Sequence, residues 1–363
     1  MRCLAILVNY HCTNLVIEAA NSLAADPECD EIRIVDNSES EIEVNRLILR
    51  LPAKTVLMVS KCNLGFAQAC NWALDGVETD AVLLLNPDAR LFPGALARLK
   101  KTLIEFKSAG AVGPRVYWDN ERNFLMPPST YPSRFNFFLD LLGLRWRWVA
   151  TFKERQFRKK AIAYWTSEKP MHVQALSGGH VLLRHTALRS VNGLFDAQFF
   201  MYWEDTDLMR RLNDRGWWLL MEPRAEAVHW YEHHIEKNRL IGLGWPIYYE
   251  KYFSSRIWRL LSFFLIGKGN SFRVQTNYKL LISGSDDQYL VPVPERIQSS
   301  WLLEISPSPN FVPSIGRFGE GSIAPLPVSL AKRFTGNYYY VRVNGVTFNS
   351  FFNTSEKYRF SSP

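Results

Sequence analysis

Small polar residues follow the apolar runs of the first 90 residues, and their amide and carboxylate groups are suited to binding a polar ligand. Three of the runs end in Asn9-Tyr10, Asp36-Asn37-Ser38 and Asn86-Pro87-Asp88. The other run is followed by Asn63-Leu64-Gly65-Phe66-Ala67, in which Gly65 opens a helical pattern whose face includes Asn71. Asn, Asp and Gly are also ordinary turn and cap residues, which is the simpler explanation for any one segment. Their recurrence after all four runs favours a shared binding edge.

A second group of ionisable residues lies between positions 204 and 207. Glu204, Asp205 and Asp207 begin a helical pattern that Gly216 ends. The helix dipole stabilises carboxylates in the first turn, which by itself would account for all three acids. A carboxylate at this position could also accept a proton in a reaction.

The four apolar runs are nearly continuous, which predicts strands buried on both faces of a parallel sheet. They are Leu4–Val8, Ile32–Val35, Val56–Val59 and Ala81–Leu85. Helical patterns lie between and after them, one with Pro93 in its first turn. This alternation predicts a doubly wound α/β domain, in which ligands bind beyond the carboxyl ends of the strands.

The rest of the chain falls into three parts. Residues 116–170 are expected to be irregular, and their basic and aromatic residues suit either an anionic substrate or membrane surface or a solvated helix face. Strands are then predicted at His180–Leu183, Trp217–Met221 and Ala225–Val228. From about residue 285 prolines separate short apolar runs, which predicts a small all-β module with a hairpin turn at Asn344-Gly345.

Composition limits the classes of protein that remain. The 363 residues are 47% hydrophobic, which excludes a disordered or collagen-like chain. The net charge of +8 favours anionic partners, but no nucleic-acid motif is present and no apolar run is long enough to span a membrane or form a signal peptide. All five cysteines lie in the first 70 residues without a CxxC pair, as expected for reduced thiols in a cytoplasmic protein.

Taken together, these segments resemble family 2 glycosyltransferases, in particular the rhamnosyltransferase-like branch. The resemblance covers roughly residues 1–255 and depends on the order and spacing of the segments. Besides those that follow the four runs, it rests on Val8, Val35, Ser177-Gly178-Gly179, Gly193-Leu194-Phe195-Asp196 and Phe200-Met201-Tyr202-Trp203-Glu204-Asp205-Thr206-Asp207-Leu208. It implies a GT-A type doubly wound mixed sheet with a helical, basic insertion. We expect a glycosyltransferase domain at 1–255, an amphipathic connecting segment at 256–284 and a β-rich C-terminal module at 285–363.

The family reaction is the inverting transfer of a sugar from a nucleoside diphosphate sugar to an acceptor hydroxyl, with dTDP-L-rhamnose as the favoured donor. By resemblance, Asn9, Asp36 and Asn63 would hold the base and ribose. The full set expected to bind the donor is Asn9, Tyr10, Asp36, Asn63, Gly65, Phe66, Asn71, Asn86, Asp88, Gly178 and Gly179.

The resemblance also implies a divalent metal and a catalytic base. Asn86-Pro87-Asp88 stands where the family carries its Asp-x-Asp motif, so one carboxylate is replaced by an amide and Asp88 is left to bind Mn²⁺ or Mg²⁺. His229 is the second expected ligand, with His233 and His234 as nearby competitors. Asp205 is the expected base and the adjacent Glu204 its rival.

Acceptor and partners follow from the same resemblance. Tyr202 and Trp203 would stack on an acceptor sugar or pack the entry of their helix. The chain lacks the Gln-x-x-Arg-Trp motif of processive synthases, so we expect it to add one sugar, or very few, to a growing glycan. A lipid-linked acceptor and attachment to the cytoplasmic face of the inner membrane would suit the positive charge and the stretch Tyr248 to Ile266. The alternative is a carbohydrate- or nucleotide-binding scaffold whose activity was lost through Asn86. The sequence leaves the oligomeric state open.

Overall fold

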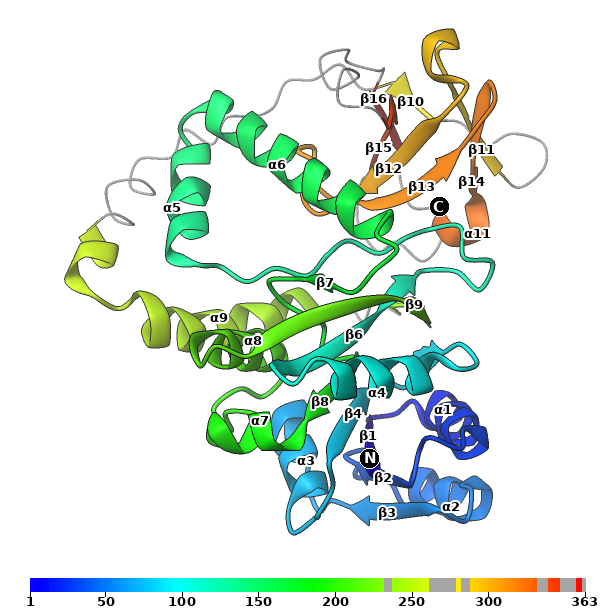
Figure 1. The fold of residues 1–363 in the computed structure, drawn as a ribbon, viewed down its shortest axis with the longest axis vertical. Helices are drawn as coiled ribbons and strands as arrows, with labels where there is room; N and C mark the ends of the chain where they lie inside the picture. Colours follow the sequence, from blue (N-terminus) through cyan, green and yellow to red (C-terminus); the bar gives the residue numbers. More distant parts are fainter. Residues whose placement is uncertain (232–236, 261–278, 282–287, 332–338, 347–356, 361–363) are drawn as a thin grey trace.

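A mixed sheet with helices on both faces forms the main part of the molecule (Figure 1). The computed structural model describes residues 1–231, 237–260, 279–281, 288–331, 339–346 and 357–360. In spatial order the strands are β3 (Thr55–Val59), β2 (Glu31–Asp36), β1 (Cys3–Asn9), β4 (Ala81–Leu85), β8 (His180–Arg184), β6 (Ala109–Tyr117), β9 (Trp218–His229) and β5 (Ala89–Leu91). Strand β7 (Met171–His172) pairs with β9 outside this path.

The first half of this sheet has the predicted parallel strands, but the prediction of burial on both faces is wrong for β3, which lies at the edge of the sheet with Val56 and Val59 exposed. Strands β1 to β4 coincide with the four apolar runs, and β1 pairs in parallel with both β2 and β4. Strand β8 runs antiparallel to β4 and β6, which makes the sheet mixed. The two short runs predicted after residue 217 form one strand, β9, because it pairs along its length with β6 across a register shift. The predicted mixed α/β class is confirmed.

Alternate residues of the strands enter two separate cores. In β1, Leu4, Ile6 and Val8 face one core, and Ala5 and Leu7 face the other. On the second of these faces lie α1 (Thr13–Ala25), α2 (Glu41–Arg50) and α4 (Ala95–Glu105). On the first lie α3 (Gly65–Leu74), α7 (His185–Ser190), α8 (Glu204–Asp214) and α9 (Lys237–Phe253). Both faces are covered, as continuous apolar strands require.

The segment expected to be irregular contains two helices. Helix α5 (Arg134–Gly143) begins at Ser133, whose side chain caps it, and packs Phe137 against Trp245 and Phe253 of α9. Helix α6 (Arg147–Trp165) follows after a short turn. The prediction of an irregular segment is therefore wrong over 134–165, because contacts with distant elements give these residues their apolar partners.

The C-terminal module is all-β apart from short helical turns, as predicted. Its larger sheet has the order β10 (Lys279–Leu280), β16 (Lys357–Phe360), β15 (Tyr339–Gly345), β12 (Trp301–Ser306) and β13 (Ile315–Gly319). A separate pair consists of β11 (Gln288–Pro292) and β14 (Ile323–Pro327), followed by α11 (Val328–Ala331). The hairpin predicted at Asn344-Gly345 is wrong, since both residues continue β15 and pair with Leu302 and Trp301 of β12. Pairing with β12 outweighs the local turn preference.

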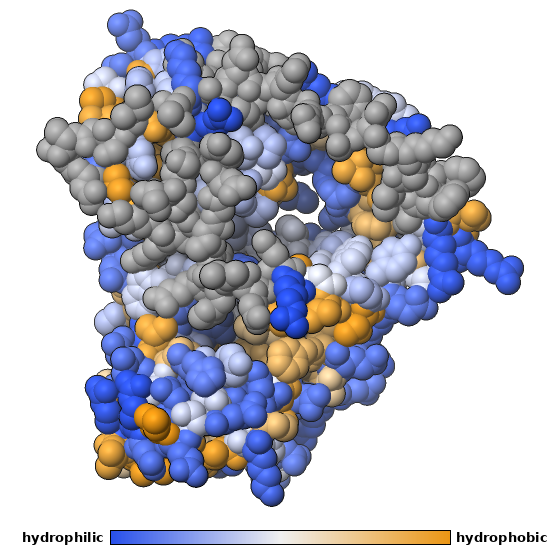
Figure 2. All heavy atoms as spheres, turned by 180° about the vertical axis from the view of Figure 1, so that it is seen from behind, coloured by the Kyte–Doolittle hydropathy of each residue, from blue (hydrophilic) through white to orange (hydrophobic). Residues whose placement is uncertain are grey.

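A buried ionic network attaches α6 to this module. Arg158 of α6 donates to Glu304 of β12 at 2.9 Å, and Arg342 of β15 donates to both carboxylate oxygens of Glu304 at 2.9 and 3.0 Å. Glu154 of α6 also accepts from Arg342. Seen from behind, the molecule is hollowed between its upper and lower parts (Figure 2).

The predicted connecting segment at 256–284 lies mostly outside the described residues, as does the end of the stretch Tyr248 to Ile266. The part that is described includes helical residues 256–260, which follow α9. Among the described residues, none of the helices has the length and apolar character needed to cross a membrane.

Candidate active site

The ends of β1 and β2 form a buried polar cluster. Their parallel register places Asn9 beside Asp36, and the Asn9 amide donates to the Asp36 carboxylate at 2.6 Å. The Ser38 hydroxyl donates to the other oxygen of Asp36 at 2.8 Å. Asp36 has 0% exposure, so its carboxylate orders the two strand ends as well as lying at the expected donor site.

The entry of α3 lies next to this cluster. The side chain of Asn37 donates to the Gly65 carbonyl at 3.1 Å, and the Gly65 amide donates to the Asn63 side chain at 3.0 Å. The Phe66 amide donates to the carbonyl of Phe200 at 2.7 Å. Gly65 has φ +74°, and a Cβ on it would lie 2.4 Å from that carbonyl, so glycine is required at this crossing. The contact joins the strand-end cluster to the loop that leads into α8.

The second half of the site is assembled by antiparallel pairing. Leu85 of β4 pairs with His180 of β8, so Asn86 lies beside Gly179. The main-chain N–H of Asn86 donates to the Gly179 carbonyl at 2.8 Å. Ala89 of β5 pairs with His229 at the end of β9. This register brings the His229 imidazole next to Asp88, which precedes Ala89. His229 Nε2 lies 3.1 Å from Asp88 Oδ1.

The two glycines at 178 and 179 connect the metal candidates to the acids of α8. The Gly178 amide donates to Asp205 Oδ2 at 3.0 Å. A Cβ on Gly179 would lie 2.8 Å from Asn86 Nδ2 and 2.9 Å from His229 Cε1. Larger residues would therefore separate Asn86, His229 and Asp205, which the structure brings together around this turn.

Glu204 and Asp205 have different surroundings. Glu204 is 5% exposed, and burial, reinforced by the charge of Asp205, raises the pKa of Glu204 well above its ordinary value. Glu204 is buried while Asp205 is partly exposed beside the glycine turn, so an acceptor hydroxyl can reach Asp205 more readily, which favours Asp205 as the base. Asp205 is only partly buried, and its Oδ1 accepts from the Thr206 amide at 2.6 Å. Asp207 has a structural task, since Arg211 and Tyr252 donate to its carboxylate at 2.7 Å each.

Two aromatic residues near His229 are not evident from the sequence. The Tyr231 ring stacks on the His229 ring with centroids 3.6 Å apart, and His180 meets His229 edge-on at 5.3 Å. Burial is the main cause, and the nearby His229 the second cause, that lowers the pKa of His180 to about 3. His180 is therefore neutral here. The only sequence signal for these residues is their position: His180 directly follows Gly179, and Tyr231 comes two residues after His229.

Unpartnered buried atoms are concentrated at this edge. Six buried side-chain atoms among the described residues have no hydrogen-bond partner, and three belong to Asn37 (Oδ1), Glu204 (Oε2) and His229 (Nδ1). Buried polar atoms are normally paired, so an unpaired group is a place where a ligand or water is expected. The edge therefore has the character of a binding site.

The donor set at Asp88 and His229 fits a divalent cation in part. The 3.1 Å between Asp88 Oδ1 and His229 Nε2 matches the spacing of neighbouring ligands on an octahedral ion with bonds of about 2.1 Å. No group of three or more His, Cys, Asp or Glu that could hold a metal occurs within the described ranges. His233 and His234 lie outside those ranges.

Three expected site residues have other contacts. Both amide atoms of Asn71 bond to the main chain of Phe195, at 2.9 Å each. Trp203 donates its indole N–H to the Ile241 carbonyl at 2.9 Å and packs against α9, which fits the packing alternative. Tyr10 is 52% exposed and adjoins His11. Tyr202 does lie near the acids, since burial and then the charges of Glu204 and Asp88 raise its pKa.

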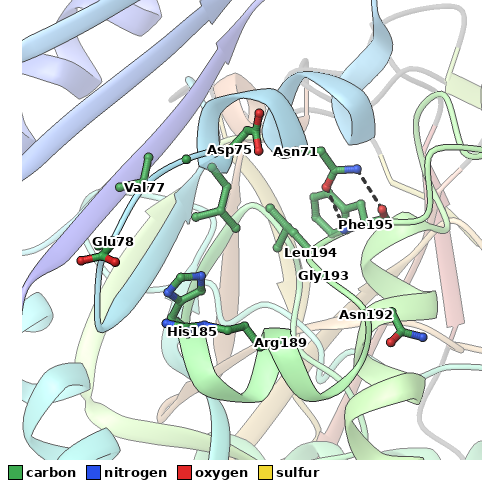
Figure 3. Close-up of a pocket in the computed structure, with 12 residues that line it drawn as sticks. Asn71, Asp75, Val77, Glu78, His185, Arg189, Asn192, Gly193, Leu194 and Phe195 are labelled. Atoms are coloured by element: carbon green, nitrogen blue, oxygen red, sulfur yellow. Dashed lines mark hydrogen bonds between the residues drawn. The ribbon is translucent and has the colours of Figure 1, made fainter.

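Asn71 lines a separate pocket of about 560 Å³ (Figure 3). The pocket lies between the end of α3 and the segment after α7, and includes Asp75, Glu78, His185 and Arg189. None of the other expected site residues lines it, so the pocket is distinct from the edge that carries Asp88 and Asp205.

The strand ends of this mixed sheet gather a carboxylate, an imidazole and a candidate base around a glycine turn, as expected of an α/β protein that binds a polar ligand. The family model described as glycosyltransferase like family 2 matches residues 4–239. The chain therefore belongs to glycosyltransferase family 2, and the resemblance drawn from the sequence is confirmed.

The individual relatives share less than a third of the aligned residues with this chain. The N-acetylglucosaminyl-diphospho-decaprenol L-rhamnosyltransferases of two Mycobacterium tuberculosis strains (CDC 1551 / Oshkosh and ATCC 25618 / H37Rv) are each 29% identical over 217 residues, covering 56% of this chain and 67% of the relative. Among solved structures, GalNAc-T7 with UDP, GalNAc and Mn²⁺ has a TM-score of 0.46 at 14% identity, over 71% of this chain and 50% of that one.

The mannosyltransferase PcManGT from Pyrobaculum calidifontis, in complex with GDP-Man and Mn²⁺, has a TM-score of 0.42 at 16% identity, over 74% of this chain and 65% of that one. The chain thus spans about half the length of the GalNAc-T7 structure.

Proposed function

We propose that this glycosyltransferase transfers one L-rhamnosyl unit from dTDP-L-rhamnose, with inversion, to a hydroxyl group of a growing, lipid-linked bacterial-type surface glycan. The observation that carries the proposal is the path of contacts from His229 and Asp88 through Gly179 and Gly178 to Asp205. The choice of sugar and of acceptor rests on the rhamnosyltransferase relatives.

The groups at the site have separable tasks in such a reaction. Asp205 would accept the proton of the acceptor hydroxyl while that oxygen bonds to the anomeric carbon, and the bond from this carbon to the diphosphate oxygen breaks. Asp88 and His229 would hold Mn²⁺ or Mg²⁺, which supplies charge stabilisation for the departing diphosphate. Gly178 and Gly179 let the main chain pass close to Asp205, Asn86 and His229, which keeps these groups together.

Nucleotide release tests the proposal. The protein is incubated with a panel of nucleoside diphosphate sugars, Mn²⁺ and a polyprenyl-diphosphate-linked N-acetylglucosamine acceptor. Release of dTDP from dTDP-L-rhamnose that depends on the acceptor is expected, and product analysis should show the inverted anomer. Release from another donor would change the assigned sugar, and a retained anomeric configuration would contradict the role of Asp205.

A non-catalytic nucleotide-binding scaffold is the second candidate. Asn86 favours it, because an amide replaces a carboxylate beside the expected metal site. Thermal stabilisation by dTDP without turnover on any acceptor of the panel would support this candidate. Restoring the carboxylate with Asn86→Asp would then test whether turnover returns.

A further inference from the structure

Most of the net positive charge of the chain comes from one segment. Residues 134–165 contain eight Arg and Lys and two acids, so they carry +6 of the net +8. Both acids contact bases: Glu154 accepts from Arg342 of the C-terminal sheet, and Asp140 pairs with Lys153. The surface of α5 and α6 is therefore strongly cationic.

Large apolar side chains of the same segment are exposed to solvent. Phe135 is 68% exposed, Trp146 45%, Trp148 71% and Phe152 46%. On α6, positions 148, 152, 155 and 159 follow one another at helical spacing, so the aromatic residues and Lys159 share one side of the helix.

The opposite side of α6 is buried. Ala161 and Trp165 pack in a core shared with the C-terminal sheet, and Arg158 is only 3% exposed within the ionic network. Helix α6 cannot roll to bury Trp148 without breaking that network. We call the exposed side of α6 the aromatic–basic surface: Trp148, Phe152, Arg155 and Lys159.

This surface is a projecting corner of the molecule. Figure 1 shows the turn between α5 and α6 at the same edge as the end of α9. Residues 256–260 follow α9 there, and the side chain of Ile257 is 69% exposed. The rings of Trp258 and of Phe137 on α5 have their centroids 5.9 Å apart. Several large apolar side chains thus point outward from one edge.

Exposed Trp and Phe interleaved with Arg and Lys match a lipid–water interface, where the rings enter the headgroup layer and the cations meet phosphate groups. We propose that the aromatic–basic surface docks on a bilayer rich in anionic phospholipid. Charge complementarity selects this partner, since the surface holds basic residues beside its rings. The proposal is independent of the sugar-transfer function and does not involve the residues of the candidate active site.

Vesicle flotation tests the docking. The full chain is mixed with vesicles of phosphatidylcholine alone or of phosphatidylcholine with phosphatidylglycerol. Binding to the anionic vesicles is expected, weakening with salt. Trp148→Ser with Phe152→Ser should abolish flotation, and Lys159→Glu should weaken binding by about fivefold or more.

Matched controls come from other faces of the molecule. Trp218→Ser, at a residue that is 42% exposed on β9, and Lys101→Glu, at a side chain 74% exposed on α4, should float like the wild type. Binding of dTDP should be unchanged in all variants, which shows that they are folded and separates this test from that of the sugar-transfer function.

Equal flotation on neutral vesicles, or flotation of the variant with both Trp148→Ser and Phe152→Ser like the wild type, would overturn the proposal. So would a wild type that forms dimers through these residues and binds no vesicles, because the surface would then be an interface between copies of the chain.

Discussion

Two groups of buried polar residues in this molecule differ in how fully they are paired. In the network of Arg158, Glu304 and Arg342, both oxygens of the central carboxylate accept hydrogen bonds from guanidinium groups. At the candidate active site, His229 and Glu204 each retain a buried atom without a partner among the described residues. The comparison separates a group that holds the fold from one that awaits a ligand.

This distinction gives opposite expectations for mutation. Breaking the paired network should cost stability and leave ligand binding alone, because α6 and the C-terminal sheet lose their connection. Changing the unpaired group should cost binding or turnover more than stability, because the unpaired atoms make no hydrogen bond that holds the fold. The four predictions below run from the largest expected effect to the smallest.

The largest effect is expected for Asp205→Asn. The amide cannot accept the acceptor proton, so kcat should fall by about 10²- to 10⁴-fold while the affinity for dTDP stays near the wild-type value. Turnover by the nucleotide-release assay and affinity by calorimetry check this. Asp214→Asn, at a side chain 65% exposed at the other end of α8, is the matched control. Near-normal turnover of Asp205→Asn would remove it as the base.

Arg342→Met should destabilise the fold by about 3–5 kcal/mol, because Glu304 is left buried with one of its two cationic partners. Urea unfolding measures the change, and dTDP affinity under folding conditions should not move. Arg224→Met removes an arginine whose side chain is 62% exposed and should cost far less. Equal destabilisation by the two variants would show that the network does not hold the C-terminal sheet.

Asp88→Ala should weaken Mn²⁺-dependent binding of dTDP by roughly tenfold or more, since even the outer partners of metal ligands are worth about that much. Binding without metal should change little. Calorimetry with and without Mn²⁺ gives both values, and Asp75→Ala in the separate pocket is the control. An equal loss with and without Mn²⁺ would contradict a metal role.

The smallest effect concerns the free energy of unfolding at low pH. Burial raises the pKa of Glu304, but Arg342 and Arg158 outweigh it, so the pKa lies below the ordinary 4.5. The corresponding stability is present above the ordinary pKa and is lost as pH falls through the lowered one. Urea unfolding from about pH 7 to about pH 3 should therefore show a steeper loss for the wild type than for Glu304→Gln. Parallel curves would contradict this linkage.

The sequence predicts those parts of the fold whose signals are local. Strands β1, β2 and β4 appear as continuous apolar runs because both faces of the sheet are covered there, and Gly65 and Gly216 mark helix ends by conformation. Local patterns do not reveal the helices α5 and α6, which only the resemblance implied as a helical, basic insertion, because their apolar residues are satisfied by α9 and the C-terminal sheet. The hairpin turn predicted at Asn344 is wrong for the same reason, because pairing with β12 decides the conformation of this residue.

The candidate site divides in the same way. Asn9, Asp36 and Asp88 follow strands directly, so their gathering at one edge follows from the topology of a parallel sheet. The stacking of Tyr231 on His229 depends on a turn at the end of β9, and the burial of Glu204 depends on the core beneath α8. Such surroundings arise from packing between distant segments, which residue types alone do not report.

A crystal soaked with Mn²⁺ and dTDP, measured for anomalous scattering at the manganese edge, tests the central claim most directly. The account predicts one strong peak bonded to Asp88 and His229, with the diphosphate beside Gly178 and Gly179. A manganese peak elsewhere, or dTDP seated in the pocket lined by Asn71 and Arg189, would contradict it.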